Sequence, residues 1–175
     1  MRLVPVTPDN SDLLWNVLQL PDLREYQDLP EVDRSQFRRM VAARPHNLVP
    51  GSWGRFEWLL YLEGVSDAVG WASLRIAERS TTTGEVGYSV VREYRGRGLA
   101  SEALRAIVDE AFMRLQMRKV RAYCVPDNVP SRRVLANAGF EEDSVLPHGA
   151  SVHGKPVDVL GFVLERVRWT QREAV

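Results

Sequence analysis

The chain has little of three things that would fix its class at once: cysteine, an excess of one charge, and long apolar runs. Its 175 residues contain one cysteine, Cys124, which excludes an internal disulfide. Cys124 stands in an apolar run, so we expect a buried, inert thiol there rather than a nucleophile. Lys and Arg together number 23, as do Asp and Glu. No net field therefore attracts nucleic acid or an anionic membrane.

Long apolar runs are equally absent. No run reaches the roughly 18 residues that cross a bilayer, and the first eight residues lack the apolar segment of a signal peptide. We therefore expect a cytoplasmic protein with neither a nucleic-acid nor a membrane partner. The length suits one domain with its own core. We predict this domain over residues 1–169, followed by a C-terminal tail over 170–175.

Hydrophobic periodicity predicts a chain that begins with strands and then alternates strands with helices. Helices are expected over 13–18, 33–43 and 99–115, with a short fourth helix between Pro130 and Gly139. Strands are expected at 3–6, 56–62, 68–77, 84–91, 119–125, 142–146 and 157–167.

Two connections complete this outline. A polar turn is expected at 80–84, and a loop containing His148, His153 and Gly154 should join the last two strands. The order of the elements predicts an α+β (mixed α/β) fold, in which one sheet carries helices on both faces.

A glycine-rich turn carries the first functional signal. Residues 95–100, Arg-Gly-Arg-Gly-Leu-Ala, lie between the strand at 84–91 and the long helix. The first N–H groups of a helix have no intrahelical partner, and the helix dipole adds positive potential there. Glycine removes the side chain that would hold an anion away. The turn therefore predicts a phosphate-binding cradle, to which Arg95 or Arg97 would add charge.

Two common phosphate-binding motifs fit this turn less well. A P-loop ends in Gly-Lys followed by Ser or Thr, whereas this turn ends in Gly98, Leu99 and Ala100. A dinucleotide-binding turn has the pattern G-x-G-x-x-G/A, in which Gly96 and Gly98 match but Ser101 takes the third position. Its strand should also be an early parallel one, whereas this strand follows others across short, hairpin-like turns.

The pattern Arg95-x-x-Gly98-x-Ala100 resembles the R/Q-x-x-G-x-G/A motif with which GNAT N-acetyltransferases bind the pyrophosphate of acetyl-CoA. The wider match covers roughly residues 84–166 and includes the Asn-x-x-Ser of residues 128–131. Order and spacing are similar to the RimJ/RimL-like branch, which contains ribosomal-protein N-terminal acetyltransferases. The resemblance implies a GNAT fold, with a central, twisted, mostly antiparallel sheet of six to seven strands.

The resemblance also implies that acetyl-CoA binds as a co-substrate and that no metal takes part. Backbone N–H groups of the turn would hold the pyrophosphate, and the pantetheine arm would pair with the preceding strand like an extra strand. An N–H near Val90 would stabilise the thioester oxyanion. Asn128 would bind the arm through its side chain, although it is equally suited to a turn or helix cap. The residues expected to bind the co-substrate are Ser89, Val90, Val91, Arg95, Gly96, Arg97, Gly98, Leu99, Ala100 and Asn128.

Catalysis is less fully specified. The resemblance implies that Ser131 protonates the departing CoA thiolate, although a serine also suits the start of a helix. Leu135 replaces the tyrosine that many GNAT enzymes place four residues later, and Ala150 replaces the glutamate of the RimJ/RimL-like branch. Candidate general bases are then His148, two residues from Ala150, and Glu85, at the start of a strand. A solvated loop histidine and an edge charge are the alternatives for these two.

Together these features predict an N-acetyltransferase that transfers the acetyl group directly to a primary amine, on a protein N-terminus or a small molecule. A non-catalytic CoA-binding sensor is the alternative, because the branch glutamate is replaced. The sequence does not decide the oligomeric state, and a homodimer stays open. Aromatic residues either line an acceptor pocket or fill the core; the candidates are Trp15, Trp53, Trp58 and Trp71.

Overall fold

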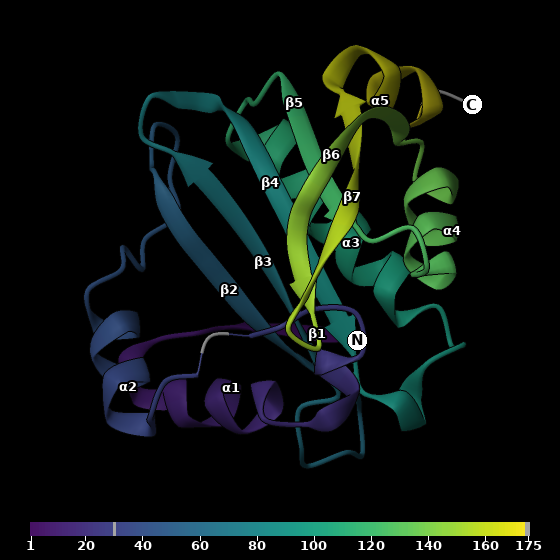
Figure 1. Cartoon of the computed structure of the whole chain (residues 1–175). Coiled ribbons are helices and arrows are strands. Elements are labelled where there is room, and N and C mark those ends of the chain that lie inside the picture. The colour runs from purple at the N-terminus through teal and green to yellow at the C-terminus, as the bar shows by residue number, and fades with distance from the viewer. Residues whose placement is uncertain (30, 174–175) are drawn as a thin grey trace.

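The computed structural model describes residues 1–29 and 31–173 and contains one seven-stranded sheet (Figure 1). The strand order is β1-β2-β3-β4-β5-β7-β6, and every pair of neighbours is antiparallel except β4 and β5, which are parallel. The predicted mixed, mostly antiparallel sheet is confirmed. The strands are β1 (Arg2–Pro5), β2 (Gly54–Tyr61), β3 (Gly70–Ala77), β4 (Ser80–Val90), β5 (Lys119–Cys124), β6 (Glu141–Val152) and β7 (Lys155–Glu165).

The helices start where local hydrogen bonding favours them. In α2, the Asp33 carboxylate accepts a hydrogen bond from the Gln36 N–H, and the Gln36 side chain accepts one from the Asp33 N–H. None of the helices in the described part of the chain is long and apolar enough to cross a membrane. The helices are α1 (Ser11–Leu18), α2 (Arg34–Ala42), α3 (Leu99–Asp109), α4 (Val129–Asn137) and α5 (Arg166–Glu173), with short helical turns η1 (Pro8–Asn10), η2 (Pro21–Arg24), η3 (Arg92–Tyr94) and η4 (Glu110–Arg114).

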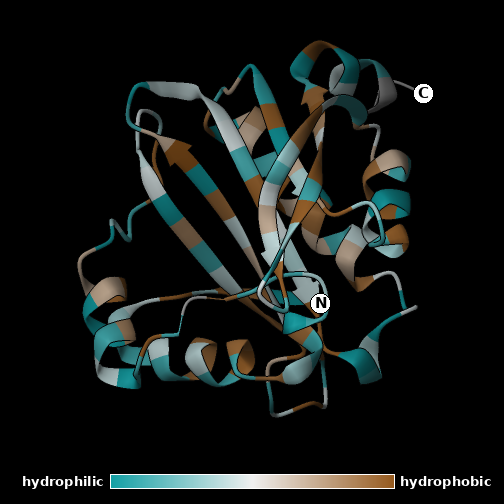
Figure 2. Cartoon of the chain, viewed as in Figure 1, coloured by the Kyte–Doolittle hydropathy of each residue, from teal (hydrophilic) through white to brown (hydrophobic). Residues whose placement is uncertain are grey.

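Side-chain alternation along the strands divides the core into two clusters. Successive strand residues face opposite sides of a sheet, so Leu59 packs with α1 and α2 whereas Leu60 packs with α3 and α4. Figure 2 shows this alternation as apolar and polar bands along β2 and β3. Helices therefore cover both faces of the sheet, as predicted.

Two strands are longer than the sequence patterns predict. β4 begins at Ser80, so the segment 80–84 is strand and the turn is made by Glu78 and Arg79. Three consecutive threonines favour extended backbone there, because β-branched side chains suit a pleated surface. β6 runs on to Val152 and contains His148, which was expected in a loop.

The register of β6 explains how it absorbs the expected loop. Its pairing with β7 shifts between Leu146 and Ala150, where Pro147 cannot donate a ladder hydrogen bond. An irregularity of this kind lets a strand continue past such residues. The turn between β6 and β7 is then formed by His153 and Gly154.

The end of the chain also differs from the prediction. β7 stops at Glu165, and α5 occupies residues 166–173, part of which was expected to be a tail. The Trp169 ring packs 5.4 Å from the Phe112 ring, centroid to centroid, which holds this helix against η4. Residues 174–175 of the expected tail lie outside the described residues.

β4 and β5 are paired over only part of their length. Their ladder runs from Thr83 opposite Lys119 to Val86 opposite Ala122. Beyond it, β4 stays paired with β3 up to Val90, while β5 stays paired with β7. The two central strands therefore separate, and a V-shaped gap opens in the middle of the sheet.

Candidate active site

The gap exposes backbone groups of β4. The Val91 N–H donates to the Val69 carbonyl at 2.9 Å, so this end of the chain stays bonded to β3. Because backbone groups alternate in direction along a strand, the N–H groups of Tyr88 and Val90 point the other way, into the gap. An amide-rich chain could pair with them as an added strand.

One cavity, of about 870 Å³, brings most of the predicted site residues together. Among the described residues, Val91, Arg97 and His148 are the predicted ones that do not line it. Trp71 is the one tryptophan of the four candidates that does. The predicted residues that line it are Glu85, Ser89, Val90, Arg95, Gly96, Gly98, Leu99, Ala100, Asn128 and Ser131.

The glycine-rich turn forms an open cradle at the start of α3. Gly96 and Gly98 have φ angles of +75° and +81°, which other residues adopt only with strain. A Cβ added to either glycine would meet nothing within 4 Å. The Glu102 N–H donates to the Gly98 carbonyl at 3.0 Å, so the N–H groups of the preceding helical residues have no partner within the helix. These residues lie at the positive end of the helix dipole and line the 870 Å³ cavity, an arrangement that suits a phosphate.

The two arginines of the turn have different roles. Arg95 is half-buried: its Nε donates to the Val90 carbonyl at 2.9 Å, and its Nη1 contacts the Glu25 carboxylate at 2.8 Å. Arg95 therefore braces the end of β4, and its hydrogen bond lowers the pKa of Glu25. Arg97 is exposed, and its guanidinium lies 5.4 Å from the Tyr94 ring centroid. Arg97 is thus the arginine whose charge remains available at the rim.

Asn128 and Ser131 meet at the start of α4. The Asn128 side-chain oxygen accepts a hydrogen bond from the Ser131 N–H at 3.1 Å, so Asn128 is the N-cap. The Ser131 hydroxyl is left for another partner and lies 3.1 Å from the Tyr88 hydroxyl. Burial raises the pKa of Tyr88 to about 12, against the opposing effect of the Ser131 hydrogen bond. Tyr88 therefore stays protonated at neutral pH.

Tyr88 is a residue of the candidate site to which the sequence gave no role. It comes from β4, 43 residues before Ser131, and its position in an apolar strand suggests only core packing. Cys124 lies on the other side of the gap, 8% exposed, and burial raises its pKa. The predicted burial of the thiol is confirmed, and the raised pKa disfavours the reactive thiolate.

The candidate bases lie in different places. Glu85 lines the cavity and pairs with Arg75, the Oε2 to Nη2 distance being 2.5 Å. Glu85 precedes Ser89 by four residues, which is about 13 Å along a strand. His148 is exposed at a φ of +53° and donates its backbone N–H to Asp158. Ala150, by contrast, lines the cavity, so the cavity has a methyl group at the position where the RimJ/RimL-like resemblance implies a glutamate.

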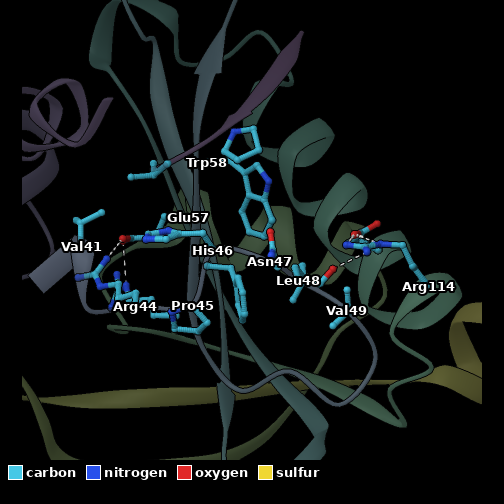
Figure 3. A pocket seen from close by; sticks show the side chains of 15 residues that line it. Val41, Arg44, Pro45, His46, Asn47, Leu48, Val49, Glu57, Trp58 and Arg114 are labelled. Carbon is cyan, nitrogen blue, oxygen red and sulfur yellow. Dashed lines mark hydrogen bonds and ion pairs between the residues drawn. The ribbon is translucent and has the colours of Figure 1, made fainter. Parts of the chain in front are cut away.

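A second cavity, of about 460 Å³, lies beside the segment between α2 and β2 (Figure 3). Its charged groups are paired with one another. Arg44 and Arg55 both bind the carboxylate of Glu57, which is 6% exposed. Arg114 binds Glu110 and the Leu48 carbonyl. Because these charged groups already bind one another, they are less available to bind a ligand. The 870 Å³ cavity is therefore the better candidate site.

The described residues contain no cluster of three or more His, Cys, Asp or Glu residues that could hold a metal ion. The chemistry available at the cavity is that of the backbone amides, the hydroxyls of Tyr88 and Ser131, and the charges of the β3–β4 face. These groups suit an anionic, amide-rich ligand in the gap and a second molecule on the sheet face.

Comparison with known proteins agrees with this geometry. An uncharacterized N-acetyltransferase, p20 of Bacillus licheniformis, is 26% identical over 157 residues, covering 89% of this chain and 87% of p20. A point mutant of the spermidine N-acetyltransferase SpeG of Vibrio cholerae has a TM-score of 0.81 at 15% identity, covering 99% of both chains. RimL, a ribosomal L7/L12 α-N-protein acetyltransferase in complex with coenzyme A, has a TM-score of 0.75 at 16% identity, covering 93% of this chain and 92% of RimL.

At these identities the two structural likenesses show the fold alone. Support for the predicted RimJ/RimL-like branch comes from sequence: the putative ribosomal N-acetyltransferase YdaF of Bacillus subtilis is 28% identical over 100 residues, covering 57% of this chain and 55% of YdaF. The sequence carries the family itself: the model of the acetyltransferase (GNAT) domain matches residues 1–141. Several relatives are named N-acetyltransferases, which supports the same activity here. The chain belongs to the GNAT family of acetyltransferases.

Proposed function

We propose that the protein transfers the acetyl group of acetyl-CoA directly to a primary amine. The observation that carries this proposal is the continuity between the cradle at Gly96 and Gly98 and the β4 edge at Tyr88 and Val90, whose N–H groups point into the gap; all four residues line one cavity. The cradle amides would hold the pyrophosphate. The β4 edge would hold the pantetheine arm and so bring the thioester close to Ser131.

The reaction would proceed by attack of the neutral amine on the thioester carbonyl. The Val90 N–H would stabilise the oxyanion that forms. Collapse of this intermediate breaks the carbon–sulfur bond, and the Ser131 hydroxyl would give its proton to the departing thiolate. The attacking nitrogen then loses a proton to water, because the closest candidate base, Glu85, lies too far along β4 for direct transfer. Water returns a proton to the Ser131 oxygen, which restores the hydroxyl for the next cycle.

Two measurements test the proposal in the same preparation. Calorimetry with acetyl-CoA should show binding, and release of free CoA thiol in the presence of an amine panel should show transfer. Acetyl-CoA binding without turnover on any amine would favour the non-catalytic sensor. Failure to bind acetyl-CoA would reject the proposed site itself. A cytoplasmic location completes the proposal, as acetyl-CoA and amine acceptors are available there.

A further inference from the structure

A row of charged side chains crosses four neighbouring strands of the sheet. Residues directly opposite one another in paired strands face the same side. Arg55 on β2 lies opposite Arg75 on β3, which lies opposite Glu85 on β4. Arg121 on β5 lies opposite Glu85 in turn. We call these four residues the arginine row, because three of them are arginines. Arg55, Arg75 and Glu85 line the 870 Å³ cavity.

The arginine row lies at the exposed end of the face that leads to the reacting end of the gap. Side chains four positions apart on a strand share a face, so Glu85 and Ser89 face the same side, about 13 Å apart. Ser89 lies opposite Trp71, which packs in the cluster formed with α1 and α2 at one end of the strands (Figure 1). Trp71 is 5% exposed, whereas the Arg75 side chain is 62% exposed. An acceptor whose amine lies near Ser89 therefore extends towards the row.

The arginines of the row and their neighbours outnumber the carboxylates that they bind. Arg55 and Arg44 share one carboxylate, and each of the other two arginines has its own. Because each guanidinium has five N–H donors in a planar fork and a carboxylate occupies at most two of them in that fork, donors remain for a ligand. The group has one positive charge in excess. Its ion pairs are Arg44 and Arg55 with Glu57, Arg75 with Glu85, and Arg121 with Asp143.

Arg55 and Arg75 form the part of the row closest to a bound acceptor. Like charges directly opposite one another on paired strands are destabilising. The Arg55 side chain is 43% exposed, and its guanidinium lies 5.7 Å from the centroid of the Trp71 ring, so it leans towards the reacting end. An anion that binds both guanidinium groups would offset their repulsion.

The other walls of the cavity do not neutralise this charge. The β6–β7 hairpin contributes residues without charge to the lining. Among the described residues that line the cavity, the acidic ones are Glu85 and Asp22, and Asp22 already accepts hydrogen bonds from the N–H and Nε of Arg92. A ligand is therefore the remaining source of negative charge for the row. The lining residues from the hairpin are Leu146, Gly149, Ala150 and Val159.

We infer that the acceptor is an anionic amine, whose amine lies near Ser89 and whose carboxylate or phosphate group is bound by Arg55 and Arg75. The two groups would be separated by two to four residues of extended chain, about 7–13 Å. This inference rests on the proposed function and narrows it to a class of acceptor. A polyamine or a basic peptide would bring further positive charge to the row and is disfavoured.

Four amidated pentapeptides that differ only at their third and fourth residues test the inference. They are Ala-Ala-Glu-Glu-Ala, its counterpart with two phosphoserines, Ala-Ala-Gln-Gln-Ala and Ala-Ala-Lys-Lys-Ala. At low ionic strength we expect kcat/KM for the glutamate or the phosphoserine peptide to exceed that for the glutamine peptide by about fivefold or more, with the lysine peptide slowest. Added salt should reduce the difference.

The glutamate and phosphoserine peptides also distinguish the two sources of the negative charge, since the better acceptor of the two identifies the group that the row binds. Equal kcat/KM for the glutamate, phosphoserine and glutamine peptides would overturn the inference.

Variants of Arg75 provide the second readout. Arg75→Gln should lower the preference for the glutamate over the glutamine peptide by about threefold, and Arg75→Glu should make the lysine peptide the better acceptor. Acetyl-CoA affinity should stay parental in both variants, because the cradle lies at α3. The matched control is Arg39→Gln, which removes the same charge from an exposed position on α2 outside the cavity. An unchanged preference in both Arg75 variants would contradict the assignment.

Calorimetric titration of the peptides into the CoA complex separates this inference from the proposed function. Tighter binding of the glutamate or phosphoserine peptide than of the glutamine peptide, without product from any amine, would retain the acceptor class and reject the transfer. Transfer to the glutamine and lysine peptides as fast as to the anionic ones would retain the transfer and reject the acceptor class. Absence of both binding and transfer for the two anionic peptides would also overturn the inference.

Discussion

The hydroxyl of Tyr88 lies 3.1 Å from the hydroxyl of Ser131, across the gap in which the thioester would bind. For Ser131 to give its own proton to sulfur, its oxygen must accept one from elsewhere or remain loosely oriented. Tyr88 is protonated at neutral pH, because burial raises its pKa to about 12. It can therefore donate to Ser131 and fix the direction in which the serine proton points.

Tyr88→Phe tests this positioning role. We expect kcat to fall by about tenfold, which corresponds to the upper end of the free energy that one hydrogen bond contributes. The KM for acetyl-CoA should not change. In a Ser131→Ala background the same substitution should have almost no further effect, because Tyr88 acts through Ser131. Additive losses in steady-state kinetics of the double variant would show that Tyr88 acts independently.

The raised pKa of Tyr88 also has a consequence for stability. The ordinary value of 10.0 applies to the unfolded chain and about 12 to the folded one, so the folded state binds this proton more tightly. Its contribution to the free energy of unfolding is complete below pH 10 and is lost as pH rises towards 12. The loss amounts to about 2 kcal/mol. In urea unfolding, the free energy of unfolding of the parent should therefore fall more than that of Tyr88→Phe as the pH rises over this range.

Sequence patterns were sufficient where the chemistry is local. The glycine-rich turn at 95–100, the capped start of α2 and the helix after Pro130 each depend on residues a few positions apart. The Ser89 and Val90 edge followed from the family resemblance, and the cavity contains both residues. Side-chain partners far apart in the chain were not predictable, because periodicity carries no information on which strand and helix meet.

Arg95 and His148 illustrate that limit. The pairing of Arg95 with Glu25 joins residues 70 positions apart, so an arginine expected to bind phosphate is engaged within the fold. His148 was expected in the loop between the last two strands. The register shift in β6 keeps it in the strand and leaves its side chain exposed, a result of tertiary pairing that overrides the local signal.

Ser131→Ala separates catalysis from helix capping. Turnover should fall by about 10²-fold, the lower end of the range for general acid catalysis, because a thiolate leaves readily. Acetyl-CoA affinity and melting temperature should stay near parental values, since the cap of α4 is the Asn128 side chain on the Ser131 backbone. Asn128→Ala should instead cost about 1 kcal/mol of stability, read as a lower melting temperature. Parental turnover in Ser131→Ala would mean that the departing thiolate takes its proton from water and not from Ser131.

Gly98→Asp tests the cradle. A carboxylate there would oppose the pyrophosphate, so we expect acetyl-CoA affinity in calorimetry to fall by about tenfold or more. The matched control is Gly51→Asp, because Gly51 has a similar φ of +86° and equally open surroundings. Both variants carry a similar backbone strain, but Gly51 does not line the 870 Å³ cavity. Equal affinities in the two variants would show that the cradle is wrongly assigned.

Direct transfer predicts that the enzyme itself is never acetylated. Cys124 is the residue to examine for acetylation, since it is a cysteine that lines the cavity. Burial raises the pKa of its thiol, however, and so keeps the thiol protonated. Incubation with labelled acetyl-CoA and no acceptor should therefore leave no label in peptide mass spectrometry. Initial rates against both substrates should give intersecting rather than parallel lines. A labelled Cys124 peptide together with parallel lines would establish an acyl-enzyme instead.

Asp28 joins two segments that border the 870 Å³ cavity. Its carboxylate accepts hydrogen bonds from the Ser151 hydroxyl at 2.6 Å, the His153 N–H at 2.8 Å and the Gly154 N–H at 2.9 Å. These bonds lower its pKa below the ordinary 3.8, so the link is complete at neutral pH and is lost only as pH falls through that lowered value. The link fastens the segment before α2 to the tip of the β6–β7 hairpin.

Asp28→Asn should loosen this link, because one side-chain oxygen replaces two while three donors still converge on it. Tyr26 and Gln27 on one side, and Gly149 and Ala150 on the other, line the cavity, so their separation should raise the KM for the acceptor. The KM for acetyl-CoA should not change, because the cradle lies on α3. Asp67→Asn, at an exposed position between β2 and β3, is the control. A rise in the KM for acetyl-CoA alone would mean that Asp28 supports the binding of acetyl-CoA rather than the binding of the acceptor.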